Sequence, residues 1–363
     1  MPQPPPPRPS LTQHCYGVIH EKLLAGTWPE GLPGERELAI QLGVSRSTLR
    51  KTLTELERDG LIHKRHGRRS LPGPRLRSSR KAGSPQKRKI ITLAPNRLHL
   101  LPTRAVYTLD ALRMRLAESG HSLEVRPLAP QASSQLTQML SQESDAIWLL
   151  YQQAPEIHRL CHESGRDCLV FGTQDARFPL PAVDLDQLAT ARHAARHLQR
   201  LGYQKDQVAL VYSSHALPGN ILMSQGVREV FGPEVAIAEI SLDSQRAPLA
   251  LDRLVEKLRR PAALILAHTR HTTCALTHFS AVRRLRIPDD LGLLCLNDDP
   301  LFPFLHPDIA RYQSDAKAVA SHLASLALRA INGAKPTPRM TRLFPDFLPG
   351  QSLLPAHLHP KDS

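Results

Sequence analysis

From Ile90 onward, short apolar runs alternate with longer amphipathic segments, and this alternation limits the folds open to the chain. The apolar runs are KIITLAP, DAIWLLY, DCLVFGT, QVALVYS, AALILAH and LGLLCLN. Between them lie segments with helical periodicity, such as TLDALRMRLAESG and DQLATARHAARHLQRLG. Strands that are apolar on both faces and separated by helices indicate parallel sheets covered by helices. About 270 residues of this pattern favour two α/β lobes over one.

Positive charge is concentrated at the N-terminal end. The net charge is +14, and residues 1–89 hold 18 Lys and Arg against seven Asp and Glu. From Lys64 to Lys89 there are eleven basic residues and no acidic one. This distribution indicates a polyanionic partner, nucleic acid before an anionic membrane.

Composition also predicts location and domain boundaries. The N-terminal MPQPPPPRPS lacks the apolar core of a signal peptide, no run is long enough to span a bilayer, and the five cysteines are scattered. We therefore expect a cytoplasmic protein without disulfides and without membrane partners. The predicted organisation is a disordered arm, a DNA-binding domain, a basic linker of Pro, Gly and Ser, and a two-lobed domain, over residues 1–10, 11–72, 73–89 and 90–355.

Residues 11–72 predict three helices followed by a basic hairpin. SLTQHCYGVIHEKLLAG and LPGERELAIQLG carry helical apolar stripes, and Ser45 is placed to cap a third helix, RSTLRKTLTELERDG, which Gly60 ends. The residues expected to pack these helices together are Leu38, Leu42, Val44, Leu49, Leu53 and Leu56. This packing turns Arg46, Ser47, Thr48 and Arg50 outward, as in a helix-turn-helix, where recognition residues enter the major groove.

The stretch LPGERELAIQLGVSRSTLRKTLTELERDGLIHKRHGRRS resembles the winged helix of GntR-type bacterial transcription regulators. The resemblance covers about residues 11–72 and implies contacts before the second helix, on the third helix and at the wing tip. Together with the basic hairpin, the predicted DNA contacts are Arg36, Ser45, Arg46, Ser47, Thr48, Arg50, Lys64, Arg65, His66, Gly67 and Arg68.

Residues 90–355 resemble the LacI/GalR-type sensor, a periplasmic-binding-protein-like fold of two lobes. The similar segments are DLDQLATARHAARHLQRLGYQKDQVALV, RIPDDLGLLCLNDD and DFLPGQSL. The resemblance implies that a small molecule binds between the lobes, and that ligand-contacting positions fall on Met223, Arg270, Asn297 and Asp298. A further position, usually Arg, falls on Gly350. Several charges that grip sugars are therefore absent or exchanged, so the effector is either not an ordinary sugar, or the cleft is ligandless and serves dimerisation.

Other polar clusters favour structural roles. His268, His271, Cys274 and His278 could share a broad helix face, but they lack the spacing of a zinc site, so we expect a polar helix at the cleft rim. His193 and His197 lie beside arginines, which disfavours a metal and favours a solvated helix face. No GxSxG, P-loop or GxGxxG motif occurs, so we expect no catalytic residues, no metal and no cofactor.

The sequence therefore predicts an α/β protein with an N-terminal winged helix-turn-helix. Its expected function is that of a homodimeric transcriptional regulator, a repressor by analogy, that binds double-stranded operator DNA as an inverted repeat. A small-molecule effector would control it. The alternative keeps the DNA-binding head and makes the large domain a dimerisation or protein-docking scaffold.

Overall fold

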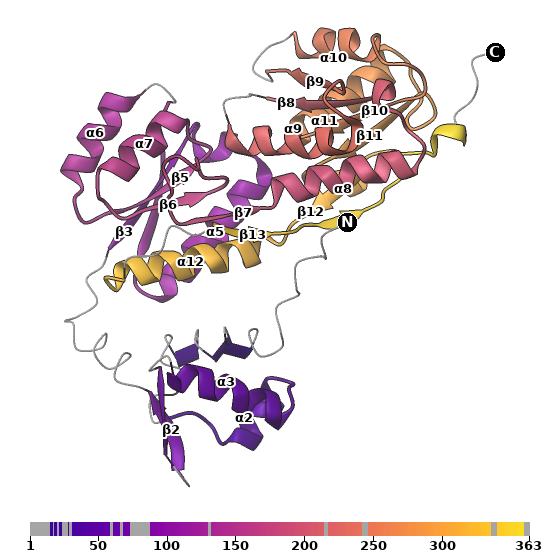
Figure 1. The fold of residues 1–363 in the computed structure, drawn as a ribbon. Coiled ribbons are helices and arrows are strands. Elements are labelled where there is room, and N and C mark those ends of the chain that lie inside the picture. The colour runs from indigo at the N-terminus through magenta and orange to yellow at the C-terminus, as the bar shows by residue number, and fades with distance from the viewer. Residues whose placement is uncertain are drawn as a thin grey trace. The chain divides into compact units, whose positions relative to one another are not determined.

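The computed structural model describes residues 15–16, 18–19, 22–23, 28, 31–58, 61–65, 68–72, 88–129, 132–213, 217–241, 246–334 and 340–358. The chain divides into two compact units, residues 1–86 and 87–363. Each unit has its own apolar core, so each is described by itself (Figure 1).

The described part of the first unit contains helices α2 and α3, part of an earlier helix, and an antiparallel hairpin. Its elements are α2 (Glu35–Gln41), α3 (Arg46–Arg58), β1 (Ile62–Arg65) and β2 (Arg68–Pro72). Described residues of the first predicted helix, among them Ile19 and Leu23, are helical and buried against these elements. The predicted core is confirmed: Leu38, Leu49, Leu53 and Leu56 are buried, while Leu42 and Val44 pack at its edge.

The second unit contains two six-stranded sheets, as the alternating pattern predicts. The first sheet is parallel throughout, in the order β13-β7-β6-β5-β3-β4. Its strands are β3 (Lys89–Ala94), β4 (Ser122–Pro127), β5 (Ile147–Tyr151), β6 (Cys168–Phe171), β7 (Ala182–Leu185) and β13 (Met340–Leu343). The second sheet, in the order β14-β12-β11-β10-β8-β9, is parallel except for β14. Its strands are β8 (Val208–Tyr212), β9 (Ala236–Glu239), β10 (Ala262–Leu266), β11 (Leu291–Cys295), β12 (Ala310–Gln313) and β14 (Asp346–Leu348).

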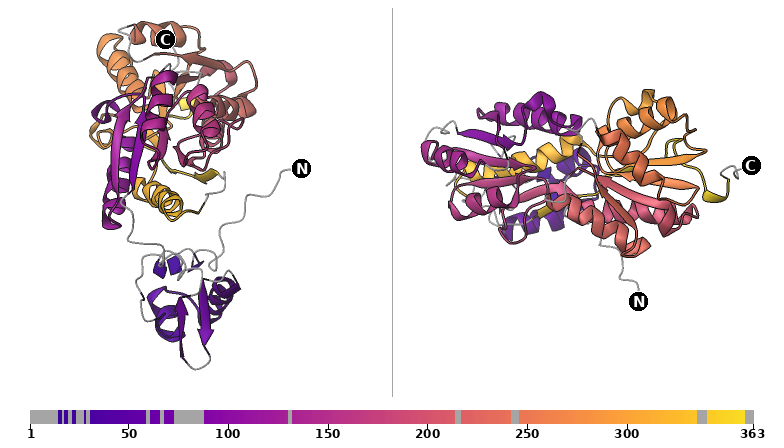
Figure 2. Two further views of the ribbon diagram at one scale, coloured as in Figure 1. Left: turned by 90° about the vertical axis from the view of Figure 1, so that its left-hand side faces the viewer. Right: turned by 90° about the horizontal axis from the view of Figure 1, so that it is seen from above.

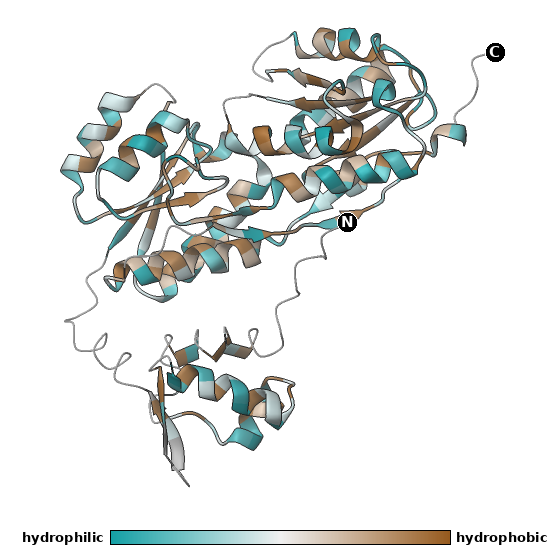
Figure 3. Cartoon of the chain, in the orientation of Figure 1, coloured by the Kyte–Doolittle hydropathy of each residue, from teal (hydrophilic) through white to brown (hydrophobic). Residues whose placement is uncertain are grey.

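Helices cover both faces of each sheet (Figure 2). The first sheet packs α5 (Thr103–Glu118) and α12 (Ala316–Ile331) on one face, with α6 (Ser133–Gln142) and α7 (Pro155–Glu163) on the other. The second packs α8 (Gln187–Arg200) and α9 (Pro218–Phe231) on one face, with α10 (Ala247–Val255) and α11 (Thr269–Thr277) on the other. Because both faces are covered, the inner strands β5, β10 and β11 are buried and apolar along their whole length (Figure 3).

The chain passes between the two lobes three times. It leaves the first lobe after β7, returns to it between β12 and α12, and leaves again between β13 and β14. The α8–α9 contact of the second lobe is close because Gly226 lies at it: a Cβ there would be 2.5 Å from the Leu188 carbonyl oxygen.

Arg88 and Lys89, at the end of the predicted linker 73–89, are bonded into the second unit, which begins at residue 87. The Arg88 guanidinium donates to the carbonyl oxygens of Asp145 and Ala330, at 2.8 and 3.2 Å, and to the Asp167 carboxylate at 3.1 Å. Lys89 is the first residue of β3. Neither cation is therefore free to neutralise a polyanion.

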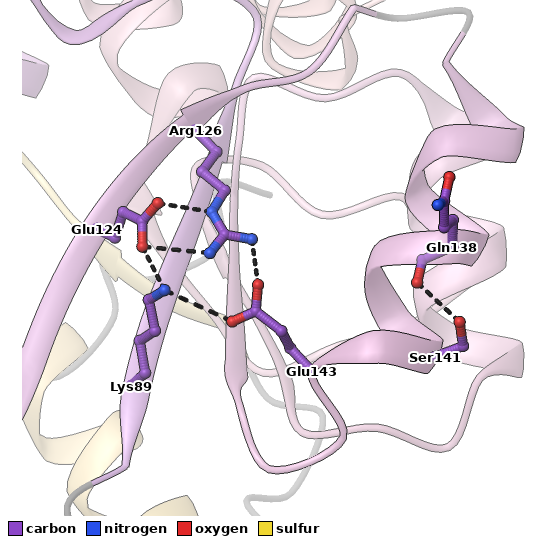
Figure 4. A network of polar contacts seen from close by, with 6 residues as sticks. All are labelled: Lys89, Glu124, Arg126, Gln138, Ser141 and Glu143. Carbon is purple, nitrogen blue, oxygen red and sulfur yellow. Dashed lines mark hydrogen bonds and ion pairs between the residues drawn. The ribbon is translucent and has the colours of Figure 1, made fainter.

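Lys89 is part of a closed ring of charges on the first lobe (Figure 4). It bonds Glu124 and lies 3.5 Å from Glu143, while the Arg126 guanidinium bonds both carboxylates. Hydrogen bonds from Arg126 and then Lys89 lower the pKa of Glu124 to about 2. The ring fastens the start of β3 to β4 and to the residue that follows α6.

Candidate nucleic-acid interface and interlobe cleft

Ser45, the predicted N-cap, does cap the start of α3. The Ser45 Oγ accepts a hydrogen bond from the Thr48 backbone N–H at 3.1 Å, which is the geometry of an N-cap. The same oxygen lies 2.8 Å from the hydroxyls of Ser47 and Thr48. The three hydroxyls at the helix start therefore form one local network.

The two sides of α3 are sharply different. Leu49, Leu53 and Leu56 are buried in the core of the first unit. Arg46 and Ser47 are exposed, as is Arg36 in the first turn of α2, whereas Thr48 is half-buried. The buried leucines set the helix rotation, so the predicted contact residues Arg46 and Ser47 are held on the outer surface.

Arg50 has a partner that the sequence analysis did not identify. Its Nε donates to the Glu35 Oε2 at 2.8 Å, and both side chains are exposed. Glu35 begins α2 and Arg50 lies in α3, so the ion pair joins the two helices of the helix-turn-helix. A signal existed in the sequence, since Glu35 is an acid at a helix start, but nothing local indicated its distance from Arg50.

The predicted wing is an antiparallel hairpin. β1 and β2 pair from Ile62 with Pro72 to Arg65 with Arg68, and Leu32 donates its backbone N–H to the Ser70 carbonyl oxygen at 2.9 Å. His66 and Gly67 lie outside the described residues, as do the side chains of Lys64, Arg65 and Arg68. Their DNA contacts stay predictions.

The four predicted ligand positions differ in burial and in their hydrogen-bond partners. Met223 is 4% exposed and packs in the core of the second lobe, which is a correction to its placement in the cleft. Arg270 is exposed in the first turn of α11. Asn297 donates to the Ala267 carbonyl oxygen at 2.6 Å.

Asp298 is also engaged within its own lobe. It accepts hydrogen bonds from Arg311 at 2.8 Å and from Gln313 at 2.9 Å. Gly350, aligned with an Arg of the resembling family, has φ +55°, and a Cβ there would lie 2.5 Å from the Ala310 nitrogen. No side chain fits at that position without a backbone shift.

A different group of residues lies where the lobes meet. The Thr103 hydroxyl at the start of α5 donates to the Asp299 carboxylate at 2.8 Å, which joins the first lobe to the second. Asp184 of β7 accepts from Thr173 at 2.5 Å and from Gln187 at 3.2 and 3.3 Å. Burial raises the pKa of the Asp184 carboxyl.

The second lobe places His268 at this junction, where the charge of Arg104 from the first lobe acts on it. Its Nε2 lies 3.1 Å from the Ser213 Oγ, and burial lowers the pKa of His268 to about 3, so the imidazole is neutral. Ser213 directly follows β8 and His268 follows β10, so both lie at carboxyl ends of parallel strands, where open α/β sheets bind ligands. That placement was a usable sequence signal.

Two histidine assignments from the sequence are wrong. His271, expected at a rim, is fully buried and its Nε2 donates to the Ile240 carbonyl oxygen at 2.8 Å. His193 and His197, expected on a solvated face, are half-buried beside Phe347, and the His193 Nδ1 lies 2.6 Å from the Tyr312 hydroxyl. Burial lowers the pKa of both imidazoles on α8.

Within the described ranges, no three His, Cys, Asp or Glu side chains are arranged to hold a metal ion. The helices of the described part include none long and apolar enough to cross a bilayer.

Comparison with known proteins finds a family match in each unit. Residues 11–71 match the family described as bacterial regulatory proteins, gntR family, and residues 195–353 match a periplasmic binding protein-like domain. An uncharacterized HTH-type transcriptional regulator of Mycobacterium tuberculosis is 43% identical over 65 residues, 17% of this chain and 27% of that protein. A fatty acid metabolism regulator protein of Pasteurella multocida is 43% identical over 62 residues, 15% of this chain and 26% of that protein. The chain thus matches about a quarter of the length of these relatives.

Solved structures resemble the second unit. A LacI family transcriptional regulator from Mycobacterium smegmatis has a TM-score of 0.63 at 15% identity, covering 73% of this chain and 99% of that one. One from Enterococcus faecium, with bound ribose, has a TM-score of 0.62 at 14% identity, covering 74% and 99%. At such low sequence identity, the structural likeness shows the fold alone. Residues 11–71 therefore match a gntR-family domain, residues 195–353 match a periplasmic binding protein-like domain, and the second unit has the fold of LacI-family regulators.

Proposed function

We propose that this protein is a cytoplasmic, homodimeric transcriptional repressor that binds an inverted-repeat operator and responds to a small-molecule effector. Residues 11–72 bind the DNA, residues 90–355 bind the effector and dimerise, and the basic segment between them acts as a linker. The observation that carries the proposal is the outer face of α3. It exposes Arg46, Ser47 and Arg50 on a helix whose other side is buried.

This face suits the major groove of B-DNA. Arg can donate two hydrogen bonds to guanine, and Ser or Thr hydroxyls suit base edges or phosphates. The β1–β2 hairpin, with its basic sequence, supplies phosphate contacts along the backbone. A single winged helix covers one half-site, so two-fold symmetry of the operator follows from a dimer.

The effector site of this proposal is the interlobe cleft around Asp184 and His268. Pockets between lobes at the carboxyl ends of parallel strands commonly bind small polar molecules. The Enterococcus faecium structure has ribose bound, which supports a ligand of similar size here.

One observation favours the alternative of a ligandless scaffold. Asn297 and Asp298, expected to bind a ligand, bond groups of their own lobe instead. Thermal-shift screening of metabolites on the full chain separates the two functions, because a scaffold shows no reproducible stabilisation by any one class of compound.

Genome-wide footprinting of bound DNA tests the regulator proposal and supplies the operator. On that operator, we expect Arg46→Ala to cost about 1–3 kcal/mol and to relax sequence preference at one base pair. Lys51→Ala is the matched control, since it removes an exposed cation from the same helix and should weaken binding to all sequences alike. Unchanged sequence discrimination in Arg46→Ala, with native circular dichroism, would refute the assignment of α3 as the recognition helix.

A further inference from the structure

Arg104 lies at the junction of the two lobes, in the first turn of α5. Its guanidinium carbon is 5.8 Å from the centroid of the Phe171 ring. Its positive charge acts on Asp184 in the first lobe and on His268 in the second. Arg104 therefore places a positive charge between Asp184 of the first lobe and His268 of the second.

The guanidinium of Arg104 has no acceptor within the described part of the chain. Its Nη1 is shielded from solvent and makes no hydrogen bond. The neighbouring carboxylates have other donors: Asp184 accepts from Thr173 and Gln187, and Asp299 accepts from Thr103. A buried donor without a partner is costly, so such a group in a cleft points to an acceptor supplied by a ligand.

The position of Arg104 strengthens its preference for a negative charge. The N-terminus of a helix carries partial positive charge and favours anions. α5 is 16 residues long and has no acidic residue in its first turn. Arg104 adds a full positive charge to this end of the helix.

From the second lobe, His268 lies near enough to Arg104 for the guanidinium charge to help lower the pKa of the imidazole. His268 is neutral, and its hydrogen-bond partner is the Ser213 hydroxyl. The Asp299 carboxylate reaches the same helix end from the second lobe, through Thr103. The junction thus already receives one carboxylate from within the protein.

We infer that the effector carries an anionic acceptor group, a carboxylate or a phosphate, which binds the Arg104 guanidinium while the rest of the molecule lies between the lobes. This inference rests on the proposed effector role of the cleft. Arg presents paired N–H donors that match the geometry of both anions. A neutral sugar would supply weaker acceptors to the same donors.

The test uses the full chain and pairs of probes that differ in one anionic group. Thermal shift and isothermal titration compare glucose 6-phosphate and glucuronate with glucose, and ribose 5-phosphate with ribose, with inorganic phosphate as a further probe. We expect an anionic member to bind and its neutral parent to bind far more weakly. Comparison of the carboxylate and phosphate members of the panel shows which of the two groups the site binds.

Arg104→Gln keeps a polar side chain but removes the charge and the guanidinium fork. The substitution should weaken binding of the anionic probe roughly 10- to 100-fold, as loss of a charge-assisted hydrogen bond does. Arg115→Gln is the matched control, because Arg115 is an exposed residue of the same helix, and binding should be unchanged in it. Binding that Arg104→Gln leaves intact, preference for a neutral parent, or silence of the whole panel at millimolar concentrations would overturn the inference.

Operator binding of the ligand-free protein is measured separately. Wild-type protein that binds its operator but prefers neutral sugars refutes the inference and leaves the proposed regulator intact. Protein that binds anions through Arg104 but recognises no DNA sequence refutes the proposed function instead.

Discussion

The Glu35–Arg50 ion pair leads to a prediction that separates DNA contact from fold stability. Arg50 is expected to contact DNA, yet its Nε is bonded to Glu35 at 2.8 Å, with the side chains 63% and 39% exposed for Arg50 and Glu35. Glu35→Gln removes the negative charge and leaves an amide of nearly the same shape. Because exposed ion pairs contribute at most about 1 kcal/mol, the domain should stay folded.

The expected gain in DNA affinity follows from Coulomb's law. Two unit charges about 4 Å apart in water interact by about 1 kcal/mol, so releasing Arg50 from Glu35 should tighten binding about fivefold. Salt screens this interaction, with a Debye length of about 10 Å at 0.1 M. The gain should therefore shrink as salt is raised. Loss of an acid from the start of α2 should cost a further 0.3–1 kcal/mol or so of stability.

Fluorescence anisotropy with operator and scrambled duplexes, over a range of salt concentrations, measures the effect. Glu37→Gln is the control, because it removes an exposed acid from the same helix and keeps the pair. Glu35→Gln should tighten binding more than Glu37→Gln does. If Glu35→Gln instead weakens operator binding, Glu35 positions Arg50 for its contact, and the interpretation of the pair as a competitor is wrong.

Three further substitutions test the fold that presents these sites. Ser45→Ala should destabilise the first unit by about 1 kcal/mol in urea unfolding, because the α3 cap is lost. Ser45→Asn keeps a capping side chain and should restore the stability. An unchanged unfolding midpoint in Ser45→Ala would contradict the role of the cap. Gly226→Ala should lower the stability of the second unit by about 1–3 kcal/mol or more in calorimetry, because its Cβ would lie 2.5 Å from the Leu188 oxygen. A wild-type melting temperature would show instead that α8 and α9 can move apart without loss of stability. Glu124 has a pKa lowered to about 2, first by its hydrogen bond to Arg126, so its stabilisation is present above the unfolded pKa near 4.5 and is lost as pH falls towards 2. Glu124→Gln should therefore flatten the acid limb of stability in that window, by less than about 1 kcal/mol at this partly exposed site; an identical acid limb would refute the role of the ring.

The strands could be predicted because their burial leaves a local pattern. The six apolar runs contain β3, β5, β6, β8, β10 and β11, since a parallel strand covered on both faces is apolar at most positions. The helix-turn-helix could be predicted for a related reason. Its core leucines and the Ser45 cap are fixed by spacing within about 20 residues of chain.

Which side of a helix becomes buried depends less on the local sequence. His193 and His197 alternate with arginines on α8, which is the pattern of a solvated face, yet Phe347 from β14 covers them. That strand arrives some 150 residues later, after the third passage between lobes. Met223 is a similar case, because the packing of α9 on the second sheet decides that it lies in the core.

The sequence predicted a ligand between the lobes, but not which residues meet there, because the junction is assembled from both lobes. Arg104 and His268 are brought together by the way the lobes meet, and neither residue belongs to a motif with fixed spacing. Arg104 nevertheless carried one local signal: it is a cation in the first turn of a long helix, where acids are favoured. An unfavourable residue at such a position needs a compensating partner, and within the described chain no acceptor reaches its buried Nη1. Helix starts favour acceptors and negative charge, which makes Ser45 a favourable residue at the start of α3 and Arg104 an unfavourable one at the start of α5. A ligand anion is the partner that would compensate the Arg104 charge.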